Sequence, residues 1–221
     1  MLGRLSWAAI LSNRTVAMLT LSYATFGYSA YIFFTWFFIY LTKVRNLDLK
    51  SGSLFGMLPF IAMAIAAPLG GWISDLLLRR GNQKIARCAL AGAAMALAGV
   101  FIVLGPQVQD VRLASVVLTG GAGALYLSQS MFWSVSSEIG GEAAGSVSGV
   151  MNMGNQLAGA LTASLSPLIA RSLGWNVSFA VAAVLCGVGA IAWAFVNPDT
   201  PIVPRVSGID DRLPHPAAQR M

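Results

Sequence analysis

The chain has 221 residues, of which 57% are hydrophobic and only 10% are charged, and its formal net charge is +6. A soluble domain carries about 25% charged residues, so this composition excludes an ordinary water-soluble protein. The positive charge does not indicate a nucleic-acid partner, because the basic residues lie in short connectors between long apolar segments. We therefore expect no nucleic acid among the partners.

Six long segments of the chain contain no Asp, Glu, Lys, Arg or His: 15–42, 51–74, 88–109, 113–137, 143–170 and 172–198. A membrane-spanning helix needs about 20 apolar residues to cross a hydrocarbon layer of about 30 Å. The segments therefore predict an all-α membrane protein, a bundle of six transmembrane helices. The expected spans are 14–42, 52–77, 86–105, 112–136, 143–171 and 176–197.

The short connectors predict one compact bundle rather than two domains. Residues 1–13 are basic and then apolar, and we expect them to form a cytoplasmic, interfacial N-terminal segment. The six-span bundle is expected over 14–198. The polar, proline-bearing stretch 199–221 is predicted to be a disordered cytoplasmic tail.

The basic residues predict the orientation of the bundle in the membrane. If the N-terminus is cytoplasmic, the inside segments carry nine Lys or Arg residues and the outside segments carry five. The positive-inside rule then favours a multi-pass protein of the cytoplasmic (plasma) membrane with both termini cytoplasmic. The first outside connector is itself basic, with Lys43, Arg45 and Lys50.

Few residues suit catalysis or metal binding. The two cysteines, Cys88 and Cys186, fall inside predicted spans, and the lone histidine, His215, lies in the predicted tail. These residues have no spacing typical of a metal site or of a disulfide framework. A membrane-embedded enzyme would need ionisable or metal-ligating side chains at depth, and the uncharged segments have none. We expect no enzyme activity and no cofactor.

Polar side chains follow one face on three of the predicted helices, the first, fourth and fifth. A polar group inside a membrane costs free energy unless it faces protein or water, so its position around the helix is informative. The residues with helical spacing are Tyr28, Tyr31, Thr35, Tyr126, Gln129, Ser130, Trp133, Ser137, Ser148, Asn152, Asn155, Gln156 and Gly159. We predict that these three helices line a polar cavity and that the third and sixth face lipid. The alternative is that the polar groups join helices, at about 0.6 kcal/mol each.

A motif between the second and third predicted helices carries the first family resemblance. Its pattern G-x-x-x-D-x-x-x-R-[RK]-G resembles the loop signature of the major facilitator superfamily. The motif residues are Gly71, Asp75, Arg79, Arg80 and Gly81. Asp75 at a helix end is placed to pair with Arg79 one turn on and with a neighbouring helix N-terminus. We predict that this charge cluster latches one conformation and breaks in the other; the alternative is a positive-inside anchor.

Further stretches are similar to the C-terminal half of the anion:cation symporters, over roughly residues 12–200. They are 36–41, 58–60, 68–75, 144–155 and 166–167, and they occur in the family's order. That family includes sugar-acid and aromatic-acid permeases and the sialin and vesicular glutamate transporters. One departure is Phe38, which stands where the family's W-x-P-x-Y-L pattern has proline.

The resemblance implies a function and a set of partners. The family has two six-helix halves with the site at their interface. This chain would be the C-terminal half of a secondary transporter for small organic anions, namely sugar-acid or aromatic carboxylates. The resemblance also implies proton coupling. Its partners would be the lipid bilayer, the anion, a proton and a second six-helix half, as a separate chain or a missing N-terminal portion. A homo-oligomeric six-span channel or a non-transporting truncated bundle is the alternative.

Within that resemblance, the polar stripes give the candidate substrate-binding residues. Phenol, amide and hydroxyl groups donate hydrogen bonds to a carboxylate. The candidates are Tyr28, Tyr31, Gln129, Ser130, Asn152, Asn155 and Gln156. Uncharged donors orient an anion but hold it weakly, so a cation from the second half is expected to supply most of the attraction.

Overall fold

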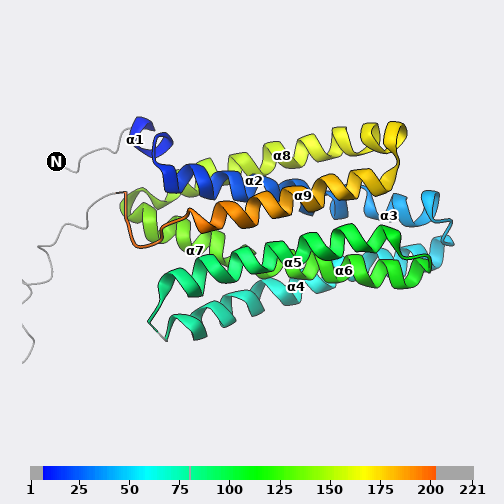
Figure 1. Cartoon of the computed structure of the whole chain (residues 1–221), viewed down its shortest axis with the longest axis horizontal. Coiled ribbons are helices and arrows are strands. Elements are labelled where there is room, and N and C mark those ends of the chain that lie inside the picture. Colours follow the sequence, from blue (N-terminus) through cyan, green and yellow to red (C-terminus); the bar gives the residue numbers. More distant parts are fainter. Residues whose placement is uncertain (1–6, 80, 203–221) are drawn as a thin grey trace, which may run out of the picture.

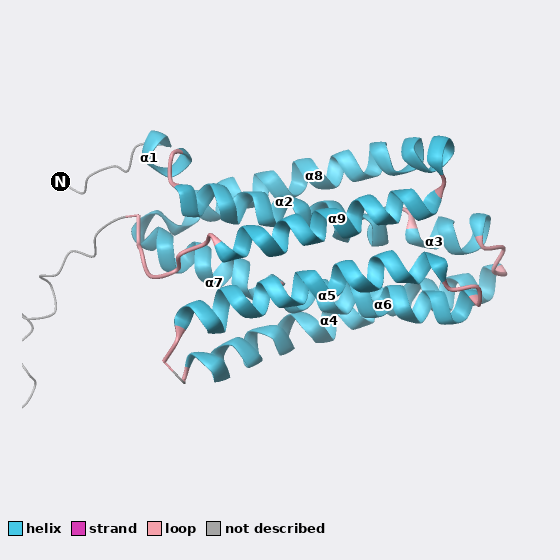
Figure 2. Cartoon of the chain, in the orientation of Figure 1, coloured by secondary structure: helices cyan, strands magenta, loops and turns pink. Residues whose placement is uncertain are grey.

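The computed structural model describes residues 7–79 and 81–202. Within these residues the regular secondary structure is entirely helical (Figure 2), as the sequence predicts. The α-helices are α1 (Trp7–Leu11), α2 (Arg14–Thr35), α3 (Phe37–Ile39), α4 (Leu49–Leu78), α5 (Leu90–Leu104), α6 (Val111–Leu127), α7 (Gln129–Gly140), α8 (Ala144–Leu173) and α9 (Trp175–Ala194). Short π- or 3-10 helices are η1 (Tyr40–Val44), η2 (Lys84–Ala89), η3 (Gly105–Gln107) and η4 (Gly141–Ala143).

The number of membrane crossings follows from the length of one helical stretch. Five stretches in the described residues are long and apolar enough to span a membrane, and one of them, Val111–Leu173, has 63 residues. That stretch would extend about 95 Å at about 1.5 Å per residue, roughly three times the hydrocarbon thickness. Figure 1 shows that it reverses direction between α7 and α8. It therefore crosses twice, and the bundle has the six predicted spans.

The helices pack as two similar groups of three. Helix α2 packs mainly against α8 and α9, whereas α6 packs mainly against α4 and α5. Helices α5 and α9 pack against each other, side by side in Figure 1. The first span, α2, thus packs against the fifth and sixth, and the fourth span, which begins with α6, packs against the second and third. Helices α2 and α6, which have equivalent positions in the two groups, run in opposite directions. Such inverted repeats are common in membrane transport proteins.

Side-chain caps fix where three spans begin. The Asn13 side chain accepts hydrogen bonds from the backbone N–H groups of the first turn of α2. Asp48 does the same for α4 and Asp110 for α6. A cap satisfies amide groups that a helix start leaves without partners. The starts of these spans are therefore encoded locally, at the polar residue before each apolar segment.

Two predicted spans are interrupted, which corrects the expectation of continuous helices over 14–42 and 112–136. The first breaks at Trp36, whose ring packs against Trp175 of α9 with centroids 6.1 Å apart. The helix breaks here although position 38 is Phe rather than the proline of the W-x-P-x-Y-L pattern. The irregularity therefore does not require a proline, and aromatic packing accompanies it instead. The second breaks at Ser128, whose hydroxyl donates to the Leu125 carbonyl at 2.6 Å. A serine bonded to its own helix offers the backbone an alternative partner.

The predicted terminal segments are only partly described. Helix α1 belongs to the expected interfacial segment 1–13, and its Trp7 and Leu11 are exposed. Residues 1–6, Arg80 and 203–221 lie outside the described residues. The domain boundaries therefore stay predictions.

Candidate functional site

Helices α2 and α8 approach each other closely along the middle of the bundle. A Cβ added at Gly27 of α2 would overlap the backbone and side-chain oxygens of Asn155 on α8. A Cβ added at Gly159 would likewise overlap the Tyr31 ring. Small residues allow membrane helices to approach at backbone distance. The glycines therefore bring the polar stripes of the first and fifth spans together.

One hydrogen-bonded group joins these two helices. The Tyr31 hydroxyl donates to Gln156 Oε1 at 2.7 Å, and Asn155 Nδ2 donates to the same oxygen at 3.4 Å. Asn155 is buried, Tyr31 is half-buried and Gln156 is exposed. The group thus runs from the packed interior to an accessible face. We call Tyr31, Asn155 and Gln156 the α2–α8 donor group.

A second polar contact joins α7 to α2. Gln129 Nε2 donates to the Tyr23 hydroxyl at 3.0 Å. The Tyr23 ring lies against Phe132, with centroids 4.6 Å apart. Tyr23 is not among the predicted site residues, although it lies about two helical turns before Tyr31 and continues the polar stripe of the first span.

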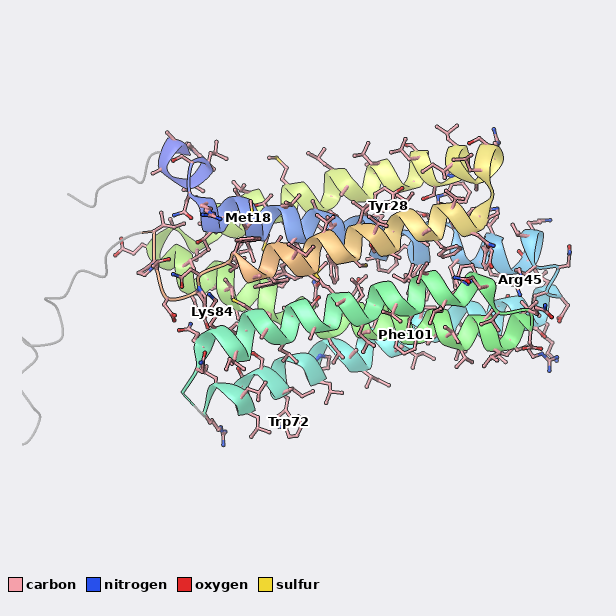
Figure 3. All side chains as sticks on the ribbon, in the orientation of Figure 1. Met18, Tyr28, Arg45, Trp72, Lys84 and Phe101 are labelled. Atoms are coloured by element: carbon pink, nitrogen blue, oxygen red, sulfur yellow. The ribbon has the colours of Figure 1, made fainter. Side chains whose placement is uncertain are left out.

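Three predicted site residues have buried polar atoms without hydrogen-bond partners among the described residues. These atoms are Tyr28 Oη, Gln129 Oε1 and Asn155 Oδ1. Figure 3 labels Tyr28 midway along the bundle, and the residue is 6% exposed. Buried polar groups in folded proteins are nearly always paired, with protein or water. These atoms therefore have unused hydrogen-bonding capacity within this bundle.

Two other predicted site residues behave differently. The Ser130 hydroxyl donates to the Ala67 carbonyl at 2.6 Å and so joins α7 to α4. This contact corresponds to the alternative of interhelical bonding, since the hydroxyl joins two helices through a backbone carbonyl. Asn152 is half-buried, and in the described part of the chain its amide makes no hydrogen bond. Its donors are consequently free.

The charge motif lies at the end of the bundle that holds residues 75–87, which we call the motif end. Arg87, at the start of the third span, lies between two carboxylates. Its Nη1 is 3.1 Å from Asp75 Oδ1 and its Nη2 is 3.0 Å from Glu138 Oε1. Nη1 also donates to the Ser74 hydroxyl at 2.9 Å, and Gln83 donates to the other Glu138 oxygen at 2.8 Å. The network thus joins α4, η2 and α7.

This network corrects the expected partner of Asp75. Arg79 is exposed and makes no ion pair among the described residues, whereas Arg87 from the next span pairs with Asp75. Arg79 follows the end of α4, so its long side chain extends into solvent, while Arg87 has a side chain only 9% exposed. Sequence reasoning counted Arg87 as a topology signal and did not single out Glu138. Their positions at the ends of uncharged segments were the available signal.

The motif glycines serve the backbone. Gly81 has φ of +88°, a conformation that favours glycine, and it turns the chain between the second and third spans. A Cβ at Gly71 would lie 3.2 Å from the Ser130 hydroxyl oxygen. Gly81 therefore shapes the loop, and Gly71 allows the close contact between α4 and α7.

These features define an integral, multi-pass membrane protein built as a six-helix half of a transporter fold. The chain belongs to the Major Facilitator Superfamily, whose sequence model matches residues 2–163. The family predicted from the loop motif is therefore confirmed.

Named relatives share most of this chain. The probable sulfoacetate transporter SauU of Cupriavidus necator is 34% identical over 175 residues, which cover 78% of this chain and 41% of that protein. The chloroplastic ascorbate transporter of Arabidopsis thaliana is 28% identical, over 85% of this chain and 35% of that protein. The probable L-galactonate transporter of Escherichia coli is 26% identical, over 86% of this chain and 43% of that protein. The chain thus spans less than half the length of these relatives.

Proposed function

We propose that this chain supplies the C-terminal half of a secondary transporter for small organic anions such as sugar acids or aromatic carboxylates. The observation that carries the proposal is the α2–α8 donor group, in which Tyr31 and Asn155 converge on Gln156 at an accessible face. The relatives named as sulfoacetate, ascorbate and L-galactonate transporters support an anionic substrate.

The chemistry of the donor group suits a carboxylate or sulfonate. Phenol and amide N–H groups donate hydrogen bonds, and the Asn152 amide lies one helical turn before Gln156 on α8. Uncharged donors orient an anion, whereas a cation supplies stronger, charge-assisted bonds. The segments that carry the proposed donors, 15–42, 113–137 and 143–170, contain no Lys or Arg. The proposal therefore assigns the cation to a second six-helix half that packs over this face.

The proposal also assigns proton coupling to that second half. A proton carrier needs an ionisable side chain at membrane depth. Among the described residues of this chain, every Asp and Glu lies outside the uncharged segments, and two of them, Asp75 and Glu138, pair with Arg87 at the motif end. They are suited to a different task, holding the motif end of the bundle in one conformation. Breakage of this network would release α4 and α7 when the transporter switches.

A complete transporter that contains this chain tests the proposed site. Alanine at Asn152 or Tyr31 is expected to weaken substrate binding by about 1–3 kcal/mol, because a donor is lost. Ser164→Ala is the matched control on α8, since this exposed hydroxyl bonds only to the carbonyl of its own helix at 3.2 Å. Binding is measured by isothermal titration with candidate carboxylates. Equal affinity of the Asn152, Tyr31 and Ser164 variants would contradict the proposed site.

Reconstitution tests the half-transporter proposal itself. The purified 221-residue chain in liposomes is expected to transport little, because its donor face lacks a partner. Robust uptake by this chain alone would favour the homo-oligomeric alternative instead. A chain that binds no second half and transports nothing in any combination would correspond to a truncated bundle.

Accessibility measurements test the proposed orientation, with both termini and residues 75–87 cytoplasmic. Cysteines introduced near Asn46 and Asp110 should react with an impermeant thiol reagent added from outside the cell. A cysteine introduced at Asn82 should not react. Labelling at position 82 in intact cells would reverse the proposed topology.

A further inference from the structure

A groove runs along the seam between α5 and α9, on helices that the proposed site does not use. Its first part is a cavity of about 510 Å³ near the motif end. The cavity is lined by Asn82, Lys84, Ile85, Cys88, Ala89, Gly92, Ala93, Ala190, Trp193 and Ala194. Trp193 is fully buried, and its indole Nε1 has no partner among the described residues. The cavity is thus mainly apolar with polar groups at one end.

A second cavity of about 360 Å³ continues the groove along the same two helices. It is lined on α5 from Ala96 to Val103 and on α9 from Ala180 to Gly187. From Ala89 to Val103 the lined part of the third span extends about 21 Å, at about 1.5 Å per residue. The two cavities therefore form a narrow, elongated groove suited to a hydrocarbon chain.

Small residues explain why the groove exists. A Cβ at Gly92 would lie 3.2 Å from the Ala190 carbonyl oxygen, and one at Gly99 would lie 3.0 Å from that of Ala183. The two backbones therefore meet along the floor of the seam. A Cβ at Gly187 would meet nothing within 4 Å, so this glycine leaves the groove open. Close backbones with few large side chains leave a furrow that lipid tails can fill.

The motif end of the groove carries positive charge. Lys84 is exposed at the beginning of the third span (Figure 3), and Asn82 beside it is also exposed. Asp199 lies after α9, and among the described residues it makes no ion pair with Lys84. A basic pocket between transmembrane helices at the membrane surface suits an anionic lipid headgroup.

We propose that the α5–α9 groove binds one anionic phospholipid, with an acyl chain in the seam and the phosphate at Lys84. The acyl chain accounts for the apolar, elongated cavities, and Lys84 accounts for a preference by headgroup charge. This site does not depend on the proposed transport function, because it uses neither the α2–α8 donor group nor the second half. In the proposed orientation the lipid belongs to the cytoplasmic leaflet.

Native mass spectrometry of the full chain, released from nanodiscs, tests the headgroup. The probes are phosphatidylglycerol and phosphatidylcholine with identical acyl chains. We expect the wild type to retain phosphatidylglycerol roughly fivefold better than phosphatidylcholine, the effect of one lysine at a membrane surface. Lys84→Gln should remove this preference, while Lys50→Gln, an exposed lysine outside the groove, should keep it. Equal retention of the two lipids by the wild type, or an unchanged preference in Lys84→Gln, would overturn the proposal.

A second pair of variants tests the acyl chain. Gly187→Leu places a side chain into the open groove, so it should reduce retention of both lipids. Val188→Leu enlarges the neighbouring exposed residue outside the groove and should leave retention unchanged. Circular dichroism establishes that each variant remains helical. Equal lipid retention by the two helical variants would mean that the lipid lies elsewhere.

Discussion

The two ends of the bundle each hold an arginine, but they bind it with different chemistry. At the motif end, Arg87 is bound by the carboxylates Asp75 and Glu138. At the opposite end, Arg45 is bound by backbone carbonyls. Its Nη2 donates to the oxygens of Val108 and Gln109 at 2.6 and 2.7 Å, and its Nη1 donates to the Tyr40 hydroxyl at 2.9 Å. In Figure 3, Arg45 and Lys84 mark these opposite ends.

The ion pairs of Arg87 can break when helices move, whereas the carbonyl bonds of Arg45 stay with the connector that they hold. Carboxylate side chains on α4 and α7 can move away from Arg87 when the helices shift, since the ion pair depends on their positions. The carbonyls that bind Arg45 belong to the connector between α5 and α6, so this arginine joins the end of the first span to that connector. It also explains why a basic residue lies in the predicted outside connector. Arg45 contributes hydrogen bonds that hold the fold together, so its charge need not be a signal of membrane orientation.

The largest expected effect is at Arg87. Arg87→Gln leaves the partly buried Glu138 without its cation, so we expect a loss of about 2–3 kcal/mol in the free energy of unfolding. Arg79→Gln, an exposed residue of the same motif, should change it by less than about 0.5 kcal/mol. Thermal unfolding in detergent measures both variants. Equal stabilities would show that the Arg87 network contributes nothing.

Arg45→Gln should have the next largest effect, a loss of about 1–2 kcal/mol in the free energy of unfolding. The loss should be smaller than for Arg87→Gln because water replaces some of the lost hydrogen bonds at this end. The loss should be the same between pH 5 and pH 8, roughly, since the carbonyl acceptors do not titrate in any ordinary pH range. Lys43→Gln, which replaces an exposed cation of the same connector, is the control. A loss that shrinks as salt is added, or that changes with pH, would indicate a carboxylate partner instead.

Glu138 and Asp75 should contribute unequally to the stability of the Arg87 network. Glu138 has a side chain 28% exposed and Asp75 one 68% exposed. A double-mutant cycle with Arg87 should give about 1–2 kcal/mol for Glu138 and less than about 1 kcal/mol for Asp75, because solvent screens the second pair. Asp75→Asn should nevertheless impair uptake by a complete transporter without abolishing membrane insertion. Wild-type uptake by this variant would reduce the motif to an anchor.

The smallest expected effect concerns Asp48, the cap of α4 at the Arg45 end. Its carboxylate accepts the Ser51 backbone N–H at 3.0 Å, which holds the pKa of Asp48 below its usual value. A lowered folded-state pKa stabilises the helix start at neutral pH, and this contribution is lost as the pH falls through that pKa. Hydrogen exchange at the Ser51 amide should therefore quicken, relative to neighbouring amides, in acid. Asp48→Asn keeps a cap that does not titrate, so exchange there should lose this dependence.

Sequence alone determined the class of this protein and the number of its spans. Uncharged segments long enough to cross a membrane, polar caps before them and the Gly71–Gly81 motif are all local features, and local chemistry fixes them. The same helical spacing that selected Tyr31 and Gln156 also placed them on facing helices, where the structure joins them at 2.7 Å. Substrate contact by these residues stays a prediction.

The tertiary structure decided which of several similar groups each polar side chain meets. Spacing could not tell that Arg87 rather than Arg79 pairs with Asp75, that Ser130 bonds to Ala67, or that Trp36 interrupts the first span. These outcomes depend on how far apart neighbouring helices lie and how they are rotated. Side-chain packing sets both quantities, and packing joins residues that are distant in sequence. Hydropathy and helical period describe one helix at a time, so they carry no record of its neighbours.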